Sequence, residues 1–311
     1  MTQPNNGAAQ KAAFVAIVGC PNVGKSSLLN AMLGQKLAIV SNKPQTTRTR
    51  IMGIWTKGET QLVFLDTPGL HRSRNRLDDY MTRSIHASVA GVDCCILVVE
   101  AGEEIRPAEQ ELLETIRKQQ LPAVLVINKI DRLAHKEQLM AQIAAWSEQY
   151  AFSAVVPVSA LKGDGVPDLL RELVGMAQEG MHFFGEEEIT DMPEQTLAAE
   201  MIREKLLRLL DKEVPHGVAV AVEHMAERES ASGPVTDIRA VIFCERDSHK
   251  GIIIGKGGAM LKKVGTYARQ DLEDFFACKI NLQLWVKVKE DWRNREAVLR
   301  SLGYDKNNFD S

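Results

Sequence analysis

The sequence predicts two consecutive globular domains: an α/β domain with a mostly parallel sheet and helices on both faces, followed by an α+β domain. Three observations indicate this order. Apolar β-rich runs alternate with amphipathic helical stretches from residue 12 to about 175. A glycine-rich loop that begins at Gly19 joins the first of these runs to a helical segment. Residues 181–196 then lose periodicity, carry an acidic run and contain Pro193, which is typical of a linker.

Length and composition agree with two domains. The chain has 311 residues, of which 45% are hydrophobic, which exceeds what one core accommodates and suffices for two. No apolar stretch reaches the ~18–20 residues of a transmembrane helix, and the N-terminus lacks the pattern of a signal peptide, so we expect a cytosolic protein. Lys and Arg outnumber Asp and Glu by 14 to 11 over residues 236–311, a modest basic bias that is compatible with nucleic-acid binding.

The expected boundaries follow from these patterns. We expect a flexible tail at 1–11, the first domain at 12–178, a linker at 179–196, and the second domain with its C-terminal tail at 197–311. The strands expected in the first domain are 13–18, 51–56, 61–65, 94–99, 123–127 and 154–158. Because ligands of open α/β sheets collect at the carboxyl ends of strands, the functional residues are expected in the loops that follow them.

The first of these loops matches a phosphate-binding motif. The segment from Gly19 to Ser26 reads G-x-x-x-x-G-K-[ST] and lies between a strand and a helix. Its backbone N–H groups and the helix N-terminus would face phosphates, Lys25 would reach the β and γ phosphates, and Ser26 would bind Mg²⁺. The predicted contacts of this loop are Gly19, Cys20, Pro21, Asn22, Val23, Gly24, Lys25, Ser26 and Ser27.

A second pair of loops predicts that the base is guanine. The segment Asn128 to Asp131 follows one strand, and Ser159 to Leu161 follows the next. The Asp131 carboxylate would accept from N1–H and the exocyclic amine of guanine, a donor pair that adenine lacks. A metabolic P-loop kinase would not explain this loop. The predicted contacts are Asn128, Lys129, Asp131, Ser159, Ala160 and Leu161.

Two further segments predict the catalytic parts. Asp66-Thr67-Pro68-Gly69 ends a strand, where Asp66 would hold Mg²⁺ through water and the Gly69 N–H would sense the γ-phosphate. The polar segment 45–49 contains two threonines, and we prefer Thr47 over Thr46 as the residue that completes the Mg²⁺ shell. The alternative for this segment is an ordinary solvated loop.

The second half of the chain contains a glycine loop in a basic setting. A helix near Gln195, strands at 218–223 and 238–245, the loop Gly255 to Gly258, a helix from Ala259 and a strand at 281–289 follow in order. Such a loop clamps the backbone of single-stranded nucleic acid in KH domains, whereas a structural turn is the alternative. For Trp285 we expect core packing rather than base stacking. The predicted RNA contacts are Lys250, Gly255, Lys256, Gly257, Gly258, Lys262, Lys263, Arg269, Lys287 and Lys289.

These motifs resemble those of a known family. The segments PNVGKS, QTTR, DTPG and NKID are similar to those of the translation-factor-related GTPases of the Era family, and REKLLRLLDKEVPHG, HKGIIIGKGG and LWVKVKEDWR extend the similarity over nearly the whole chain. The order of elements in the second half resembles a type II KH domain. The resemblance implies GTP hydrolysis with Lys25, Thr47 and Gly69 as catalytic residues, with Mg²⁺ held by Ser26, Thr47 and Asp66.

The resemblance also implies finer properties. Leu70 stands where other GTPases have a water-orienting glutamine, so intrinsic hydrolysis is expected to be slow. Asn22 stands where potassium-dependent relatives have an asparagine, which favours K⁺ as a cofactor, and a purely structural role in the loop is the alternative.

The resemblance also implies partners, namely the 3′ end of 16S rRNA and the 30S subunit. It implies a role in 16S rRNA processing, and no DNA partner is expected. Peripheral association with the inner membrane is also implied. The alternative hypothesis is that the second domain binds a protein or a membrane instead of RNA.

Overall fold

The computed structural model describes residues 9–69, 75–212, 214–231 and 233–304. The chain divides into two compact units. The first unit comprises Met1–Ala38, Thr47–His71 and Arg83–Asp191, and the second comprises Ile39–Thr46, Arg72–Thr82 and Met192–Ser311. The second unit therefore includes two short segments that precede the linker region in the sequence.

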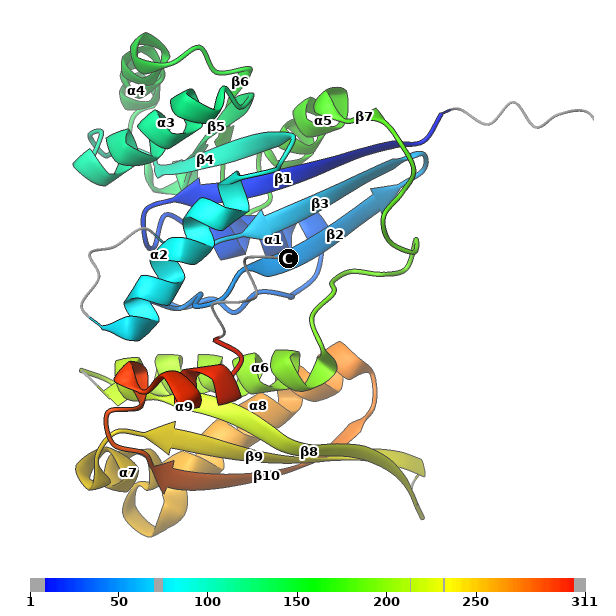
Figure 1. The fold of residues 1–311 in the computed structure, drawn as a ribbon, viewed down its shortest axis with the longest axis vertical. Helices are drawn as coiled ribbons and strands as arrows, with labels where there is room; N and C mark the ends of the chain where they lie inside the picture. Colours follow the sequence, from blue (N-terminus) through cyan, green and yellow to red (C-terminus); the bar gives the residue numbers. More distant parts are fainter. Residues whose placement is uncertain (1–8, 70–74, 213, 232, 305–311) are drawn as a thin grey trace, which may run out of the picture. The chain divides into compact units, whose positions relative to one another are not determined.

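The first unit is built on a seven-stranded sheet in the described part of the chain (Figure 1). The order β2-β3-β1-β4-β5-β6 is parallel except for β2, and the short β7 pairs with β1 in antiparallel fashion. The strands are β1 (Lys11–Gly19), β2 (Ile51–Lys57), β3 (Thr60–Asp66), β4 (Cys94–Glu100), β5 (Ala123–Asn128), β6 (Ala154–Val158) and β7 (Gln178–Glu179). The predicted mostly parallel sheet is confirmed, and the six longer strands lie where the apolar runs predicted them.

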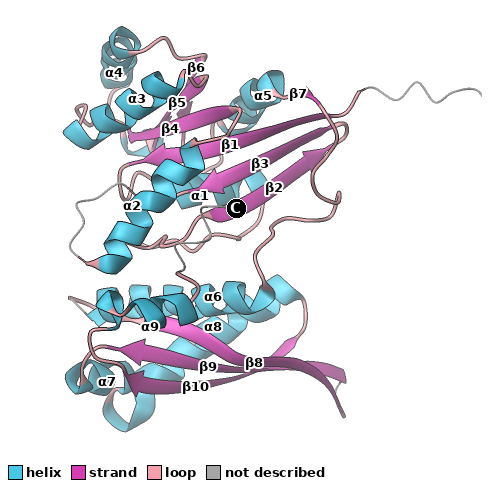
Figure 2. Cartoon of the chain, in the orientation of Figure 1, coloured by secondary structure: helices cyan, strands magenta, loops and turns pink. Residues whose placement is uncertain are grey.

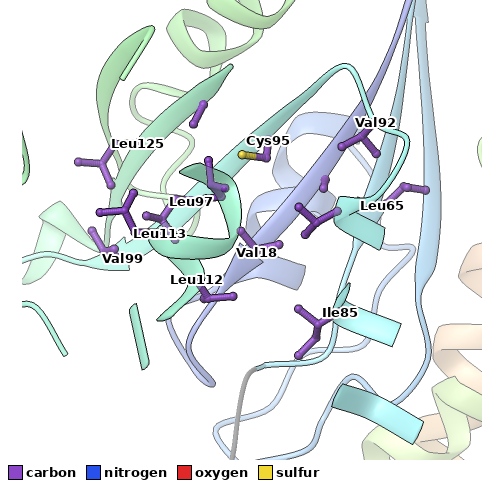
Figure 3. Packing of buried hydrophobic residues seen from close by; sticks show 14 of the residues in the cluster. Val18, Leu65, Ile85, Val92, Cys95, Leu97, Val99, Leu112, Leu113 and Leu125 are labelled. Carbon is purple, nitrogen blue, oxygen red and sulfur yellow. The ribbon is translucent and has the colours of Figure 1, made fainter. Parts of the chain in front are cut away.

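Helices cover both faces of this sheet. They are α1 (Lys25–Leu33), α2 (Arg76–Val89), α3 (Pro107–Gln119), α4 (Lys136–Gln149) and α5 (Val166–Met176), with a 3₁₀ turn at Ile130–Arg132. On one face, Ile85 of α2, Leu113 of α3 and Trp146 of α4 belong to one buried cluster with side chains of β1, β3, β4 and β5. Figure 3 shows Ile85 and Leu113 in this cluster. The helices α1 and α5 contact each other and β3. Burial of this apolar surface stabilises the scaffold from which the loops project.

The second unit has a three-stranded sheet with the order β10-β9-β8, in which β10 is parallel and β8 antiparallel to β9 (Figure 2). The apolar stripe of α6 and that of α8 pack on the sheet through residues such as Ile202, Leu206 and Val264. The elements are α6 (Glu194–Leu209), β8 (Ala219–Ser230), β9 (Gly233–Cys244), α7 (Asp247–Ile254), α8 (Ala259–Phe276), β10 (Lys279–Val288) and α9 (Glu296–Ser301), with 3₁₀ turns at Val214–Gly217, Lys256–Gly258 and Trp292–Asn294.

One helix of the second unit was not predicted, and one expectation for this unit is wrong. The run Gly251 to Ile254 belongs to helix α7, which the sequence did not indicate because glycine and three β-branched residues are weak helix formers. Trp285 is not a core residue, since 44% of it is exposed. The alternation of β10 explains this result, because Leu282 and Leu284 take the core-facing positions of the strand.

In the described part of the chain, no helix combines the length and the apolarity that crossing a membrane requires.

Candidate nucleotide-binding site and basic groove

The loop between β1 and α1 has a backbone that only glycine permits at two positions. Gly24 has φ of 100°, and a Cβ there would lie 2.3 Å from Asn128 Nδ2. A Cβ on Gly19 would lie 2.4 Å from the carbonyl oxygen of Val98. Asn22 also has a positive φ of 64°, a conformation that asparagine tolerates better than most residues. The loop is therefore shaped by its own residue types and by contact with β4 and β5.

Lys25 projects into this loop from the first turn of α1. Its side chain is 6% exposed, and its Nζ donates to the carbonyl oxygens of Gly19 at 3.0 Å and Cys20 at 3.1 Å. Burial lowers the pKa of Lys25, and the nearby negative charge of Asp66 opposes that effect. The Lys25 ammonium group therefore places positive charge on the inner side of the loop.

Three oxygen-bearing side chains meet beside Lys25. Ser26 Oγ lies 2.8 Å from Thr47 Oγ1 and donates to Asp66 Oδ2 at 2.7 Å. Asp66 Oδ1 is buried and has no hydrogen-bond partner in the described part of the chain. Burial raises the pKa of Asp66 to about 6, although the charge of Lys25 and the Ser26 hydrogen bond lower it. An oxygen-only donor set with an unsatisfied carboxylate oxygen fits Mg²⁺.

The neighbouring threonine has different contacts. Thr46 Oγ1 donates to the carbonyl oxygen of Lys43 at 2.7 Å and lies 2.7 Å from Ser41 Oγ. Its hydroxyl is therefore used within its own segment, whereas that of Thr47 faces Ser26. Among the described residues, no cluster of three or more His, Cys, Asp or Glu side chains suits a metal. A cation at this position would therefore depend on the one Asp66 carboxylate, on hydroxyls and on ligand phosphates.

The segment after β3 lies against the phosphate-binding loop. Thr67 Oγ1 donates to the carbonyl oxygen of Ile17 on β1 at 2.8 Å, and Pro68 is buried. A Cβ on Gly69 would lie 2.7 Å from Pro21 Cα, so no side chain fits there without displacing the loop. The expectation about Leu70 lies outside the described residues.

The two segments that the sequence predicts to read the base are tied to each other and to the loop between β1 and α1. Asn128 Nδ2 donates to the carbonyl oxygen of Val23 at 2.8 Å, and Asn128 Oδ1 accepts from the backbone N–H of Ala160 at 3.0 Å. Lys129 Nζ donates to the carbonyl oxygen of Asn22 and to Glu100 Oε2, both at 2.6 Å. Sequence reasoning missed Glu100, although its position at the carboxyl end of β4 is a recognisable signal.

Asp131 is held in the ionised state. Ser159 Oγ donates to Asp131 Oδ1 at 2.6 Å, and this hydrogen bond is the main reason that the pKa of Asp131 lies below its usual value. An ionised carboxylate only accepts hydrogen bonds, which suits the two donors on the guanine edge. Leu161, the last residue of this set, is 84% exposed. The geometry brings together all the segments that the sequence predicted for the nucleotide site.

The glycine loop of the second unit borders a groove. Gly255, Gly257 and Gly258 have positive φ of 73°, 58° and 80°, and a Cβ on Gly255 would lie 2.9 Å from the backbone nitrogen of Met260. A cavity of about 360 Å³ lies between α8 and β10. Its lining is Gly258, Leu261, Lys262, Gly265, Thr266, Arg269, Ile280, Asn281, Leu282 and Leu284. Three predicted RNA contacts therefore line one groove, and Thr266 and Asn281 join them without having been predicted.

The other predicted cations surround this groove or lie elsewhere. Lys256 is exposed in the glycine loop, and Lys263 lies on α8 with its Nζ 5.9 Å from the ring centroid of Tyr267. Lys250 is in α7. Lys287 forms an exposed ion pair with Glu223 at 3.3 Å, and Lys289 Nζ lies 4.9 Å from the ring centroid of Phe243. These last two lysines do not line the groove.

Comparisons with known proteins find relatives of both halves of the chain. The family model described as 50S ribosome-binding GTPase matches residues 14–129, and the KH domain model matches residues 213–293. The GTPase Era of Clostridioides difficile (strain 630) is 46% identical over 295 residues, which are 95% of this chain and 99% of that protein. The GTPase Era of Ruminiclostridium cellulolyticum is 47% identical over 297 residues, covering 96% and 98%.

Solved structures give the same result. Crystal structures of Era bound to GDP and AlF₄⁻ from Aquifex aeolicus, and of Era in complex with MgGDPNP and nucleotides 1506–1542 of 16S ribosomal RNA, each superpose with a TM-score of 0.90 at 38% identity. Each covers 95% of this chain and 99% of the solved chain. The predicted fold class and the predicted resemblance are confirmed, and this chain belongs to the Era family of GTPases.

Proposed function

We propose that this GTPase binds the 3′ end of 16S rRNA through the groove at Gly255–Gly258, and that it acts in 16S rRNA processing and in biogenesis of the 30S subunit. The observation that carries the proposal is the groove itself, in which Lys262 and Arg269 stand beside a loop with no side chain at Gly258. This geometry suits an extended, anionic and unpaired strand. The likeness to an Era structure that holds a 16S rRNA fragment supports the same assignment.

The nucleotide site would act mainly by positioning and by electrostatic stabilisation. Lys25 would turn from the carbonyl oxygens of its own loop to the β and γ phosphates of GTP. Ser26, Thr47 and Asp66 would hold Mg²⁺, which supplies positive charge for the developing charge on the phosphoryl oxygens. The backbone N–H of Gly69 would contact the γ-phosphate from the side of Pro21. Asp131 and the N–H of Ala160 would read the guanine edge.

Potassium belongs to the same proposal as a second cation. Asn22 is exposed at the rim of the loop, and the oxygen of its side-chain amide is a group that would bind K⁺. Replacing KCl with NaCl at equal ionic strength should then slow hydrolysis, and Asn22→Ala should abolish the difference. Equal rates in both salts for the unmutated protein would leave Asn22 with the loop-shaping role that its positive φ supports.

The glycine loop gives the sharpest test of RNA binding. The double variant Lys256→Asp with Gly257→Asp adds two carboxylates where a phosphate must approach, so binding of an RNA with nucleotides 1506–1542 of 16S rRNA should weaken strongly. Each lost phosphate contact should also flatten the salt dependence of log K by about 0.7. The control is Lys118→Asp with Gly175→Asp, the same charge change at exposed positions of α3 and α5. GTP hydrolysis without RNA should persist in both variants.

The outcomes of these binding experiments distinguish RNA binding by the second unit from a purely structural glycine loop and from membrane binding. A folded loop variant that binds this RNA as tightly as the parent, with the same salt slope, would show that the loop is structural. Binding of the parent to vesicles with anionic lipids, but not to the RNA, would favour the hypothesis that the second unit binds a membrane. Depletion of the protein in cells should lead to accumulation of 16S rRNA precursor and free 30S intermediates. The expected cytosolic location, with or without peripheral membrane association, can be followed by fractionation of the same cells.

A further inference from the structure

One aromatic residue of the second unit lies outside the groove and is not used by the proposed contacts. Trp285 on β10 is 44% exposed, whereas Trp146 and Trp292 are fully buried. Along β10, Leu282, Leu284 and Val286 pack toward the helices, and the alternate residues Gln283, Trp285 and Lys287 are exposed. Because side chains alternate between the two faces of a sheet, these three residues share the face opposite α6 and α8.

The strand register gives Trp285 a defined setting. Trp285 pairs with Val241 of β9, which is 1% exposed, and Val241 pairs with Ala221 of β8. The row across the sheet is therefore apolar, with Val241 next to the indole and the smaller Ala221 on the strand beyond it. The neighbouring row places Gln283 beside the exposed Arg239. The indole is thus bordered by two cations, Arg239 on one side and Lys287 on the other.

The charge partner of Lys287 does not prevent an anion from binding there. Lys287 Nζ lies 3.3 Å from Glu223 Oε1, and the two side chains are 56% and 52% exposed. Ion pairs with this exposure contribute little and exchange readily with solvent. A phosphate can therefore replace the carboxylate at small cost.

The platform around Trp285 is continuous with the groove. In the described three-stranded sheet, β10 is an edge strand, and its residues Ile280, Leu282 and Leu284 line the groove on the helix side. Trp285 lies on the same strand, directly after Leu284 and on the opposite face. A chain that leaves the groove across the edge of the sheet can therefore reach the indole.

The surroundings favour a nucleobase over a protein partner. Protein interfaces need a well-packed apolar core with several large side chains. In the described part of the second unit's sheet, Trp285 is the exposed large apolar side chain, and polar residues frame it. A single aromatic ring among cations is the arrangement on which unpaired bases stack in single-strand-binding proteins.

We propose that Trp285 stacks on one unpaired base of the RNA, next to the nucleotides in the groove, with Arg239 and Lys287 near its flanking phosphates. This inference rests on the proposed RNA-binding function and adds a second contact on the face of the sheet opposite α6 and α8. Stacking does not depend on base identity, so this contact would add affinity and register rather than sequence specificity.

The experiment compares Trp285→Ala and Trp285→Phe in the full chain. Binding of the RNA with nucleotides 1506–1542 should weaken about 10-fold in Trp285→Ala and much less in Trp285→Phe, because phenylalanine retains a stacking face. The salt slope of log K should stay unchanged, since no phosphate contact is removed. Tryptophan fluorescence of the parent should be quenched on RNA binding, and that quenching should fall in both variants. Phe183→Ala, which removes a 60% exposed aromatic from the first unit, is the matched control.

Shortened RNAs locate the contact. Removing nucleotides one at a time from each end should reach an RNA on which the parent and Trp285→Ala bind equally well, which marks the stacked base. If the loop variant loses RNA binding while Trp285→Ala binds every RNA like the parent, the stacking proposal is wrong and the proposed function stands. If the parent itself does not bind the RNA, the proposed function fails, and the stacking proposal fails with it.

Discussion

Single residues at the nucleotide site act mostly by holding loops together. Asn128 joins the phosphate-binding loop to the loop after β6, because its amide donates to Val23 and its carbonyl accepts from Ala160. A buried side chain with both groups satisfied fixes two loops at once, since an unpaired buried amide is costly. The proposed binding surface for the base therefore depends on a residue that need not touch the base.

Asp131→Asn should transfer the preference of the site from guanosine to xanthosine nucleotides. The 2-oxo group of xanthine is an acceptor where guanine has a donor, and the asparagine amide supplies a matching donor. Titrations with GTP and with xanthosine triphosphate measure the effect. A variant that still prefers GTP would rule out Asp131 as the base reader.

Gly69→Ala should reduce GTP turnover at least 10-fold with little loss of nucleotide affinity. The added Cβ would lie 2.7 Å from Pro21 Cα, so the segment after β3 must move away from the γ-phosphate position. The matched control is Gly175→Ala in α5, where a Cβ meets nothing within 4 Å and stability should rise by about 0.5–1 kcal/mol. Steady-state kinetics of both variants are compared, and equal turnover would contradict the role of Gly69.

At the scale of elements, helix α6 has a buried charged side as well as an apolar stripe. Glu204 is fully buried and accepts from the backbone N–H of Val40, from Lys205 and from Arg208, at 2.8–2.9 Å. Arg203, 1% exposed, pairs with Glu200 and donates to the carbonyl oxygen of Thr46. The segment Ile39–Thr46 is thereby held on α6 within the second unit.

Glu204→Ala should destabilise the second unit by about 3 kcal/mol, because it removes one member of a buried ionic network and leaves the Val40 N–H without its acceptor. Glu204→Gln keeps an acceptor and should cost less. Asp168→Ala, which removes an exposed partner of Arg171, should cost under about 1 kcal/mol. Urea unfolding followed by far-UV circular dichroism gives the three values, and similar costs for Glu204→Ala and Asp168→Ala would contradict the network.

At the scale of the whole molecule, the second unit is assembled from three separate stretches of chain. Leu77, Tyr80 and Met81 of α2 form one buried cluster with Trp292 and other residues near the C-terminal end of the chain. The ring centroids of Tyr80 and Tyr304 lie 5.7 Å apart in an edge-to-face arrangement. This cluster lies on the opposite side of the unit's sheet from the core under α6 and α8, since it includes Phe243 and Ala219.

A fragment that begins at Met192 should therefore be less stable than the same unit in the full chain. It lacks three buried side chains of α2, each worth about 1.5–3 kcal/mol of burial, so a loss of at least 4 kcal/mol is expected. Thermal unfolding measures the loss, and acrylamide quenching reports the accessibility of Trp292 in a background in which Trp55, Trp146 and Trp285 are replaced by Phe. If Trp292 is as protected from acrylamide in the fragment as in the full chain, the prediction that α2 stabilises this unit is wrong.

Much of the fold and of the nucleotide site was predictable because local residue types encode them. Alternating apolar runs predict the strands of the parallel sheet, and Gly24 with Lys25 predicts a phosphate loop, since only glycine takes its backbone conformation. The glycine loop at 255–258 was recognisable for the same reason. Helix α7 and the exposure of Trp285 were not predictable from the sequence. The formation of a short helix, and the choice of which face of a strand is buried, depend on tertiary packing.

The sequence by itself determined the loop chemistry, the order of the elements and the family. Only the tertiary structure decided which polar residues are buried. The run Arg203, Glu204 and Lys205 has the composition of a solvated surface, yet all three residues are buried. Their partners, such as Val40, lie 164 positions away from Glu204, and no local pattern encodes that contact. The same holds for Thr46 and Thr47, adjacent residues whose hydroxyls have different partners because one faces its own segment and the other faces Ser26.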